Sequence, residues 1–161
     1  MKWLPLILLF FCACSSIDCP VKTKVRTVYS IRSSKDVADS LRDTLTVATF
    51  KLDKKGFRKD TALLSSSTGI VQFSLPVGYT TAEDTLFFVF KNGLFSAIDT
   101  VWVQKDNYPH FESVDCKVSY FHRLTTVRST HYAIDSITIK NPNVTYESDA
   151  AHFYLYLKSR H

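Results

Sequence analysis

Residues 85–91 constrain the fold of this chain more than any other segment. The run Leu-Phe-Phe-Val-Phe at positions 86–90 is apolar at every position, so both faces of an extended strand would be apolar. Such a strand is usually central in its sheet and covered on both sides. Asn92 and Gly93 follow directly, and this dipeptide is a strong signal for a two-residue β-hairpin. We therefore expect residues 95–104 to pair back antiparallel.

Six further segments carry the alternation or apolar runs of strands, between turn signals at short intervals. They are residues 21–32, 45–52, 70–75, 114–124, 134–139 and 153–157. The first alternates apolar and basic residues and predicts a half-buried strand. The apolar phase shifts within residues 45–52, which predicts a β-bulge. Residues 33–43 are polar, although Val37 and Leu41 would support one helical turn.

About eight strands without a convincing amphipathic helix predict an all-β fold. The pattern favours an antiparallel β-sandwich, Ig-like or similar, over a barrel. The 161 residues suit a single domain, which we expect to span residues 20–161. Hydrophobic residues make up 45% and charged residues 22%, and these values argue against disorder.

The formal net charge of +5 raises the question of a nucleic-acid or anionic-membrane surface. The basic residues are scattered, and acidic residues lie between most of them. No basic helix, RNA-binding aromatic motif or zinc-finger spacing accompanies the charge. We favour solvated strand faces and turns, and expect no nucleic-acid partner.

The start of the chain predicts export. Lys2 precedes an uncharged apolar run of eleven residues at positions 3–13. A membrane-spanning helix needs about 20 residues, so this run fits the apolar core of a signal peptide instead. We interpret residues 1–13 as that signal peptide and residues 14–19 as a tether.

Cys14 is the predicted site of lipid attachment. The segment Phe-Cys-Ala-Cys-Ser-Ser at 11–16 resembles a bacterial lipoprotein processing site, in which a small residue precedes the acylated cysteine. Acyl chains such as palmitate would then replace the signal peptide as the membrane anchor. The alternative is ordinary cleavage after Ser15 or Ser16, which would release a soluble secreted β-domain.

The number of cysteines left after processing agrees with lipidation of Cys14. Cleavage before Cys14 discards Cys12, and acylation uses Cys14, so one pair remains in an oxidising compartment. A bridge between Cys19 and Cys116 would close a loop of nearly one hundred residues. In the chain-entropy model it contributes roughly 4–5 kcal/mol. The alternative is two free buried thiols.

No motif for catalysis or cofactor binding occurs in the sequence. GxSxG, P-loop, GxGxxG and HExxH patterns are all missing, and the four glycines are too few for a Gly-rich phosphate cradle. No CxxC or HxxxH spacing suggests zinc. The five histidines could bind a metal only if the strands brought them together, because their spacing in the sequence does not. We favour exposed or edge positions for them instead. They are His110, His122, His131, His152 and His161. We therefore expect that the protein is not an enzyme and that it binds neither a cofactor nor a metal ion.

Aromatic residues on the later strands offer the best candidate binding surface. An exposed platform of such rings would bind a sugar or a peptide, whereas buried rings would only fill the core. The candidates for the platform are Trp102, Tyr108, Tyr120, Tyr154 and Tyr156, with Phe111 nearby.

The order of several short motifs resembles a family of small, uncharacterised lipoproteins from Bacteroidota-type bacteria. The motifs are Cys14, Cys19 before a Pro-led strand, Phe-Ser-Leu-Pro at 73–76, the run at 86–90, Asp-Thr-Val-Trp-Val at 99–103, and Tyr-Pro-His-Phe-Glu-Ser at 108–113 leading to Cys116. The resemblance implies a β-rich lipoprotein but no particular activity.

Together these features predict an exported lipoprotein that acts as a non-catalytic binding or scaffolding module. We expect it in the cell envelope, attached to the outer membrane through the lipid on Cys14, with an envelope protein or a glycan as partner. The alternatives are a carbohydrate- or peptide-binding module that uses the exposed aromatic residues, and a secreted or periplasmic domain without a lipid.

Overall fold

The computed structural model describes residue 19 and residues 24–52, 55–56, 58–146 and 150–159. These residues form ten strands. The strands are β1 (Arg26–Arg32), β2 (Thr44–Leu52), β3 (Arg58–Ser67), β4 (Gln72–Pro76), β5 (Glu83–Asn92), β6 (Phe95–His110), β7 (Ser119–Ser129), β8 (Ile134–Ile139), β9 (Asn143–Val144) and β10 (Phe153–Leu157). No described segment is a helix long and apolar enough to cross a membrane.

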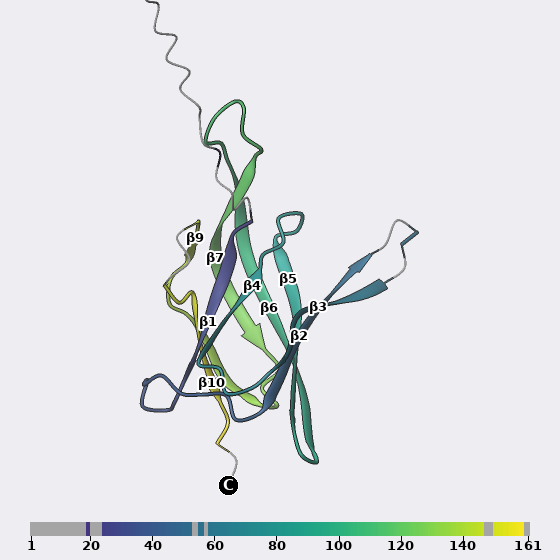
Figure 1. Ribbon diagram of the computed structural model, residues 1–161, viewed down its shortest axis with the longest axis vertical. Coiled ribbons are helices and arrows are strands. Elements are labelled where there is room, and N and C mark those ends of the chain that lie inside the picture. The colour runs from purple at the N-terminus through teal and green to yellow at the C-terminus, as the bar shows by residue number, and fades with distance from the viewer. Residues whose placement is uncertain (1–18, 20–23, 53–54, 57, 147–149, 160–161) are drawn as a thin grey trace, which may run out of the picture.

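The strands form two sheets, as the sandwich prediction requires (Figure 1). One sheet has the order β4-β1-β10-β8 and the other the order β3-β2-β5-β6-β7-β9. All pairs are antiparallel except β1 with β10, which run parallel. The all-β sandwich predicted from the alternating patterns is therefore confirmed.

The core lies between the two sheets and is rich in aromatic rings. Tyr29 of β1 stacks on Phe73 and Phe153 at ring-centroid distances of 5.0 and 4.7 Å. It also meets Phe88 of the opposite sheet edge to face at 5.9 Å. Phe88 and Phe90 are fully buried, and each buried aromatic side chain contributes roughly 1.5–3 kcal/mol by leaving water. These rings therefore join the two sheets.

Strand β5 is central, as predicted, but it is covered on one side only. It pairs with β2 and β6. Its inward residues are buried, whereas Phe87 and Val89 on the outer face are half-buried. The hairpin to β6 also forms, and its two-residue loop is Gly93 and Leu94, because Asn92 already pairs with Phe95. Gly93 has a φ of 56°, which suits glycine.

Two strands of the structure were not anticipated. Strand β3 pairs with β2, and it overlaps residues 53–60, whose composition predicts a turn, and residues 65–69, whose composition predicts a serine-rich loop. Strand β9 has only two residues. The predicted bulge is present, because the register of β2 with β3 shifts between Leu45 and Ala48. Ten strands thus replace the expected eight.

Three other expectations from the sequence were wrong in detail. No helical turn forms in residues 33–43, where the chain makes turns and an isolated bridge. The strand expected over residues 114–124 begins only at Ser119, and Val114 is fully exposed. Strand β1, which lies between β4 and β10, is buried on both faces from Thr27 to Ile31 and not half-buried as expected.

Candidate functional site

The predicted disulfide is present. Cys19 and Cys116 are bonded, with Cα atoms 5.5 Å apart and a sequence separation of 97 residues. The bond ties the segment before β1 to the connection between β6 and β7. Because β1 starts and β6 ends there, the bond lies at one end of the sandwich, which we call the disulfide end. Cys14 lies outside the described residues.

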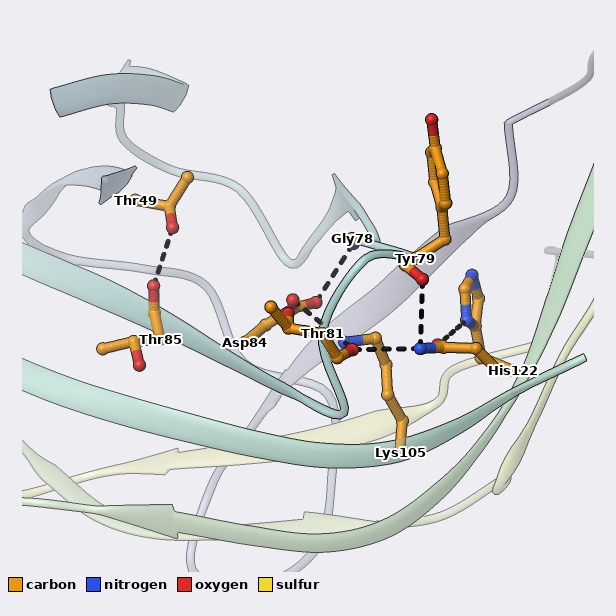
Figure 2. A network of polar contacts seen from close by, with 9 residues as sticks. Thr49, Gly78, Tyr79, Thr81, Asp84, Thr85, Lys105 and His122 are labelled. Carbon is orange, nitrogen blue, oxygen red and sulfur yellow. Dashed lines mark hydrogen bonds and ion pairs between the residues drawn. The ribbon is translucent and has the colours of Figure 1, made fainter. Parts of the chain in front are cut away.

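A network of buried polar groups lies on the inner side of β6 towards this same end (Figure 2). The ammonium group of Lys105 is 2.9 Å from a carboxylate oxygen of Asp84, and the Lys105 side chain is completely buried. Lys105 also donates to the carbonyl of Thr81 at 3.2 Å. The second Asp84 oxygen accepts the backbone N–H of Gly78 at 3.1 Å.

A larger residue at position 78 would displace the Asp84 carboxylate, because a Cβ atom there would lie 2.7 Å from an Asp84 oxygen. The side-chain amide of Asn107 donates to the carbonyls of Tyr79 and Thr81 at 3.3 and 3.0 Å. The network therefore fastens the connection between β4 and β5 to β6.

His122 extends the network from β7. Its Nδ1 lies 2.7 Å from the side-chain oxygen of Asn107 (Figure 2). Burial lowers the pKa of His122 to about 4, and the positive charge of Lys105 adds to the shift, while Asp84 opposes it. The ring is therefore neutral at pH 7. Since the groups satisfy one another, the arrangement holds the fold rather than presenting a reactive group to solvent.

Asp99 is the counterpart of Lys105 towards the opposite end of β6. Its fully buried carboxylate accepts the backbone N–H groups of Tyr132, Ala133 and Ile134 at 2.6–2.8 Å. The hydroxyl of Thr130 also donates to it, at 2.8 Å. Burial alone would raise the pKa of Asp99, but these four hydrogen bonds outweigh burial and lower it. Asp99 thus fixes the turn between β7 and β8.

The alternation of residues in β6 already marks Asp99 and Lys105 as buried charges. Asp99, Val101, Val103 and Lys105 share the inward face of β6, where the alternation predicts apolar residues. A charged residue in such a register is buried only with partners, so it marks a polar network. The sequence interpretation missed this signal.

The remaining histidines lie at separate places. His152 is buried, and its Nδ1 accepts the backbone N–H of Val28 at 3.0 Å. His110 pairs with Glu112 at 2.8 Å, and His131 lies 2.9 Å from the carbonyl of Asp135. Within the described residues, no three histidine, cysteine or acidic side chains are grouped to hold a metal ion. His161 lies outside them.

The structure distributes the five platform candidates over different surfaces. Trp102 and Tyr108 lie on the outer side of β6, and Arg128 packs over the Trp102 ring at 5.0 Å. Tyr120 stacks on Tyr79 at 4.7 Å, close to the polar network.

The other two candidates belong to the second sheet. Tyr154 and Tyr156 alternate with the buried Phe153 and Leu155 of β10, so they face outward. Arg32 covers the Tyr154 ring at 4.1 Å. The five rings therefore do not form one surface. Phe111, named beside them, is 65% exposed in the connection between β6 and β7.

A groove of about 960 Å³ lies at the end of the sandwich opposite the disulfide. It is formed where β1 and β10 end, where β2 begins, and beside the hairpin between β5 and β6. In Figure 1 these segments meet at the bottom of the view. Its volume is near the upper end of the range for ligand sites, roughly 300–1,000 Å³.

Charged side chains of both signs line the groove. They are Arg32, Arg42 and Lys158, and Asp39, Asp43 and Asp135. Apolar surface lies between them, from Ile31, Phe95 and Leu157. A balanced set of charges beside apolar surface suits a ligand that carries both charges and apolar groups.

Two groups give the groove a defined shape. Asp43 is buried and accepts a hydrogen bond from the Asn92 amide at 3.2 Å. The hydroxyl of Tyr156 donates to Asp36 at 2.8 Å and braces the loop after β1. The Nε of Arg32 is buried, and no described residue accepts its hydrogen bond. Such a donor needs a partner.

Comparison with known proteins gives a family but no activity. No curated protein matches the chain, and no solved structure does. Residues 44–157, well over half of the 161 residues, match the family described as a family of unknown function, DUF6452. The matched region contains the polar network but only a third of the residues that line the groove, namely Asn92, Phe95, Asp135, Tyr156 and Leu157. The chain therefore belongs to the DUF6452 family.

Proposed function

We propose that this chain is an exported lipoprotein whose β-sandwich is a non-catalytic binding module of the cell envelope. Cys14 carries the lipid and attaches the domain to the outer membrane. The groove at the end opposite the disulfide binds a peptide segment of an envelope protein.

The observation that carries this proposal is the position of the disulfide and the groove at opposite ends of the sandwich. Cys19 is five residues from Cys14, so the disulfide end lies near the anchor. The groove then faces away from the membrane, where a partner can reach it. A disulfide also fits a compartment that keeps cysteines oxidised, which supports export.

The charges of the groove favour a peptide over a neutral glycan. Three basic and three acidic side chains line it, and a peptide can supply charges of both signs. The guanidinium groups of Arg32 and Arg42, which line the groove, offer donors to carbonyl or carboxylate oxygens. A glycan would instead need flat exposed rings. Phe95 and Tyr156, which line the groove, are half-buried.

Selection from a random peptide library on the purified mature protein tests the groove. Arg42 lines the groove and is exposed, so Arg42→Glu should leave the fold intact and abolish binding of the selected peptides. Arg123→Glu is the matched control, because Arg123 is exposed on β7 and does not line the groove. Equal binding by both variants would refute the groove as the site, as would binding to a glycan array alone.

Cell fractionation tests the anchor. Wild-type protein should sediment with the outer membrane, and a Cys14→Ala variant should leave the membrane fraction. A variant that stays with the membrane would contradict the lipid anchor.

A further inference from the structure

The connection between β6 and β7, residues 111–118, carries apolar side chains that the protein does not cover. Val114 is 99% exposed, Phe111 65% and Val118 41%. Single exposed apolar residues are common on protein surfaces, but three within eight residues form a local apolar tip. We call this connection the apolar loop.

The apolar loop has a defined conformation. The backbone N–H of Cys116 donates to the carbonyl of Ser113 at 3.2 Å, and that of Asp115 donates to the Ser113 hydroxyl at 3.3 Å. The disulfide then fixes Cys116 to Cys19. In Figure 1 the loop, drawn in green, extends beyond both sheets at the disulfide end. Val114 is therefore held out from the domain.

Chain length places this loop near the proposed lipid. Cys14 lies five positions before Cys19, and an extended chain spans at most about 3.6 Å per position, or about 18 Å in all. The Cα atoms of Cys19 and Cys116 are 5.5 Å apart. The loop cannot lie far from a membrane that holds the acyl chains of Cys14.

We infer that the apolar loop inserts Phe111 and Val114 into the lipid surface to which Cys14 is attached. This inference rests on the proposed lipidation. The loop acts as a second contact beside the acyl chains, and two contacts hold a protein more firmly and in a fixed orientation. That orientation directs the groove away from the membrane.

The attraction is apolar rather than electrostatic. The loop carries Glu112 and Asp115 against Lys117, so it has no excess of positive charge. Contact with the lipid should therefore change little with salt or with the content of anionic lipid.

A fluorescent label at position 114 tests the inference. Lipidated mature protein with Val114→Cys is labelled with an environment-sensitive dye, since Cys19 and Cys116 are bonded to each other. It is reconstituted in vesicles of phosphatidylethanolamine and phosphatidylglycerol that contain a nitroxide-labelled lipid. Leu94→Cys is the matched control, because Leu94 is fully exposed in the hairpin at the opposite end.

The dye at position 114 should shift its emission to the blue and lose most of its fluorescence to the nitroxide lipid. The dye at position 94 should keep the emission that it has in buffer. Equal spectra at the two positions, on protein whose Cys14 is acylated, would overturn the inference and leave the lipoprotein proposal standing. An unmodified Cys14 by mass spectrometry would overturn both.

Discussion

The buried pair of Lys105 and Asp84 makes the most direct prediction about stability. Asp84→Asn keeps the shape of the side chain and removes its charge. Lys105 would then remain completely buried without a counter-charge. The single amide oxygen of Asn could accept from Lys105 or from the Gly78 N–H, but not from both as the two Asp84 oxygens do. A buried charge that loses its partner keeps its full desolvation cost. We therefore expect Asp84→Asn to destabilise the fold.

The size of the effect follows from the burial of the two partners. Breaking a fully buried ion pair costs about 3–5 kcal/mol. The Asp84 side chain is 19% exposed, so water already screens it in part. We expect the lower end, about 3 kcal/mol in the free energy of unfolding. For a domain of this size that corresponds to a fall in Tm of about 6–12 °C.

Guanidinium unfolding of the disulfide-bonded protein, followed by circular dichroism, measures the loss. Glu83→Gln is the control, since the neighbouring Glu83 pairs at 3.0 Å with Arg128 on the surface, where such pairs contribute less than about 1 kcal/mol. Replacing both charges, in Lys105→Met with Asp84→Asn, should restore most of the stability. If Asp84→Asn lost no more stability than Glu83→Gln, the argument from burial would be refuted.

Three further predictions concern other fixed points of the fold. Cys116→Ser should lower the free energy of unfolding by up to about 4–5 kcal/mol in chemical denaturation, and a change below 1 kcal/mol would contradict the loop-closure argument. Asp99→Ala leaves three backbone N–H groups of the β7–β8 turn without their acceptor, so we expect a loss of about 3 kcal/mol and faster amide exchange at those N–H groups. The pKa of His122 is about 4 in the fold against 6.5 as its ordinary value, so the unfolded chain binds a proton first as the pH falls. Stability should therefore decrease between pH 6.5 and 4, by up to about 3 kcal/mol, and a His122→Gln variant should show a flatter profile.

Local patterns in the sequence predict much of the fold. The apolar run at 86–90 lies in the central strand β5, and the hairpin after it forms one residue later than Asn92 and Gly93 suggest. The phase shift within β2 marks the bulge against β3. Counting the cysteines predicts the disulfide. The strand, the hairpin and the bulge each depend on residues close together in the sequence. The disulfide follows because Cys12 and Cys14 are excluded as partners.

Features that depend on how one segment pairs or packs with another could not be predicted. Strand β3 has the composition of a turn and a serine-rich loop, and it is extended because β2 supplies its hydrogen-bond partners. Tyr154 and Tyr120 look equivalent in the sequence, but they belong to different sheets. The groove joins segments from β1 to the end of β10, so no single pattern marks it.

Mass spectrometry of the mature N-terminal peptide tests the central claim most directly. We expect a peptide that begins at Cys14 and carries the added mass of a diacylglycerol group and an acyl chain. An unmodified N-terminus at Ser16 or Ile17 would contradict it, because the domain would then be released without an anchor.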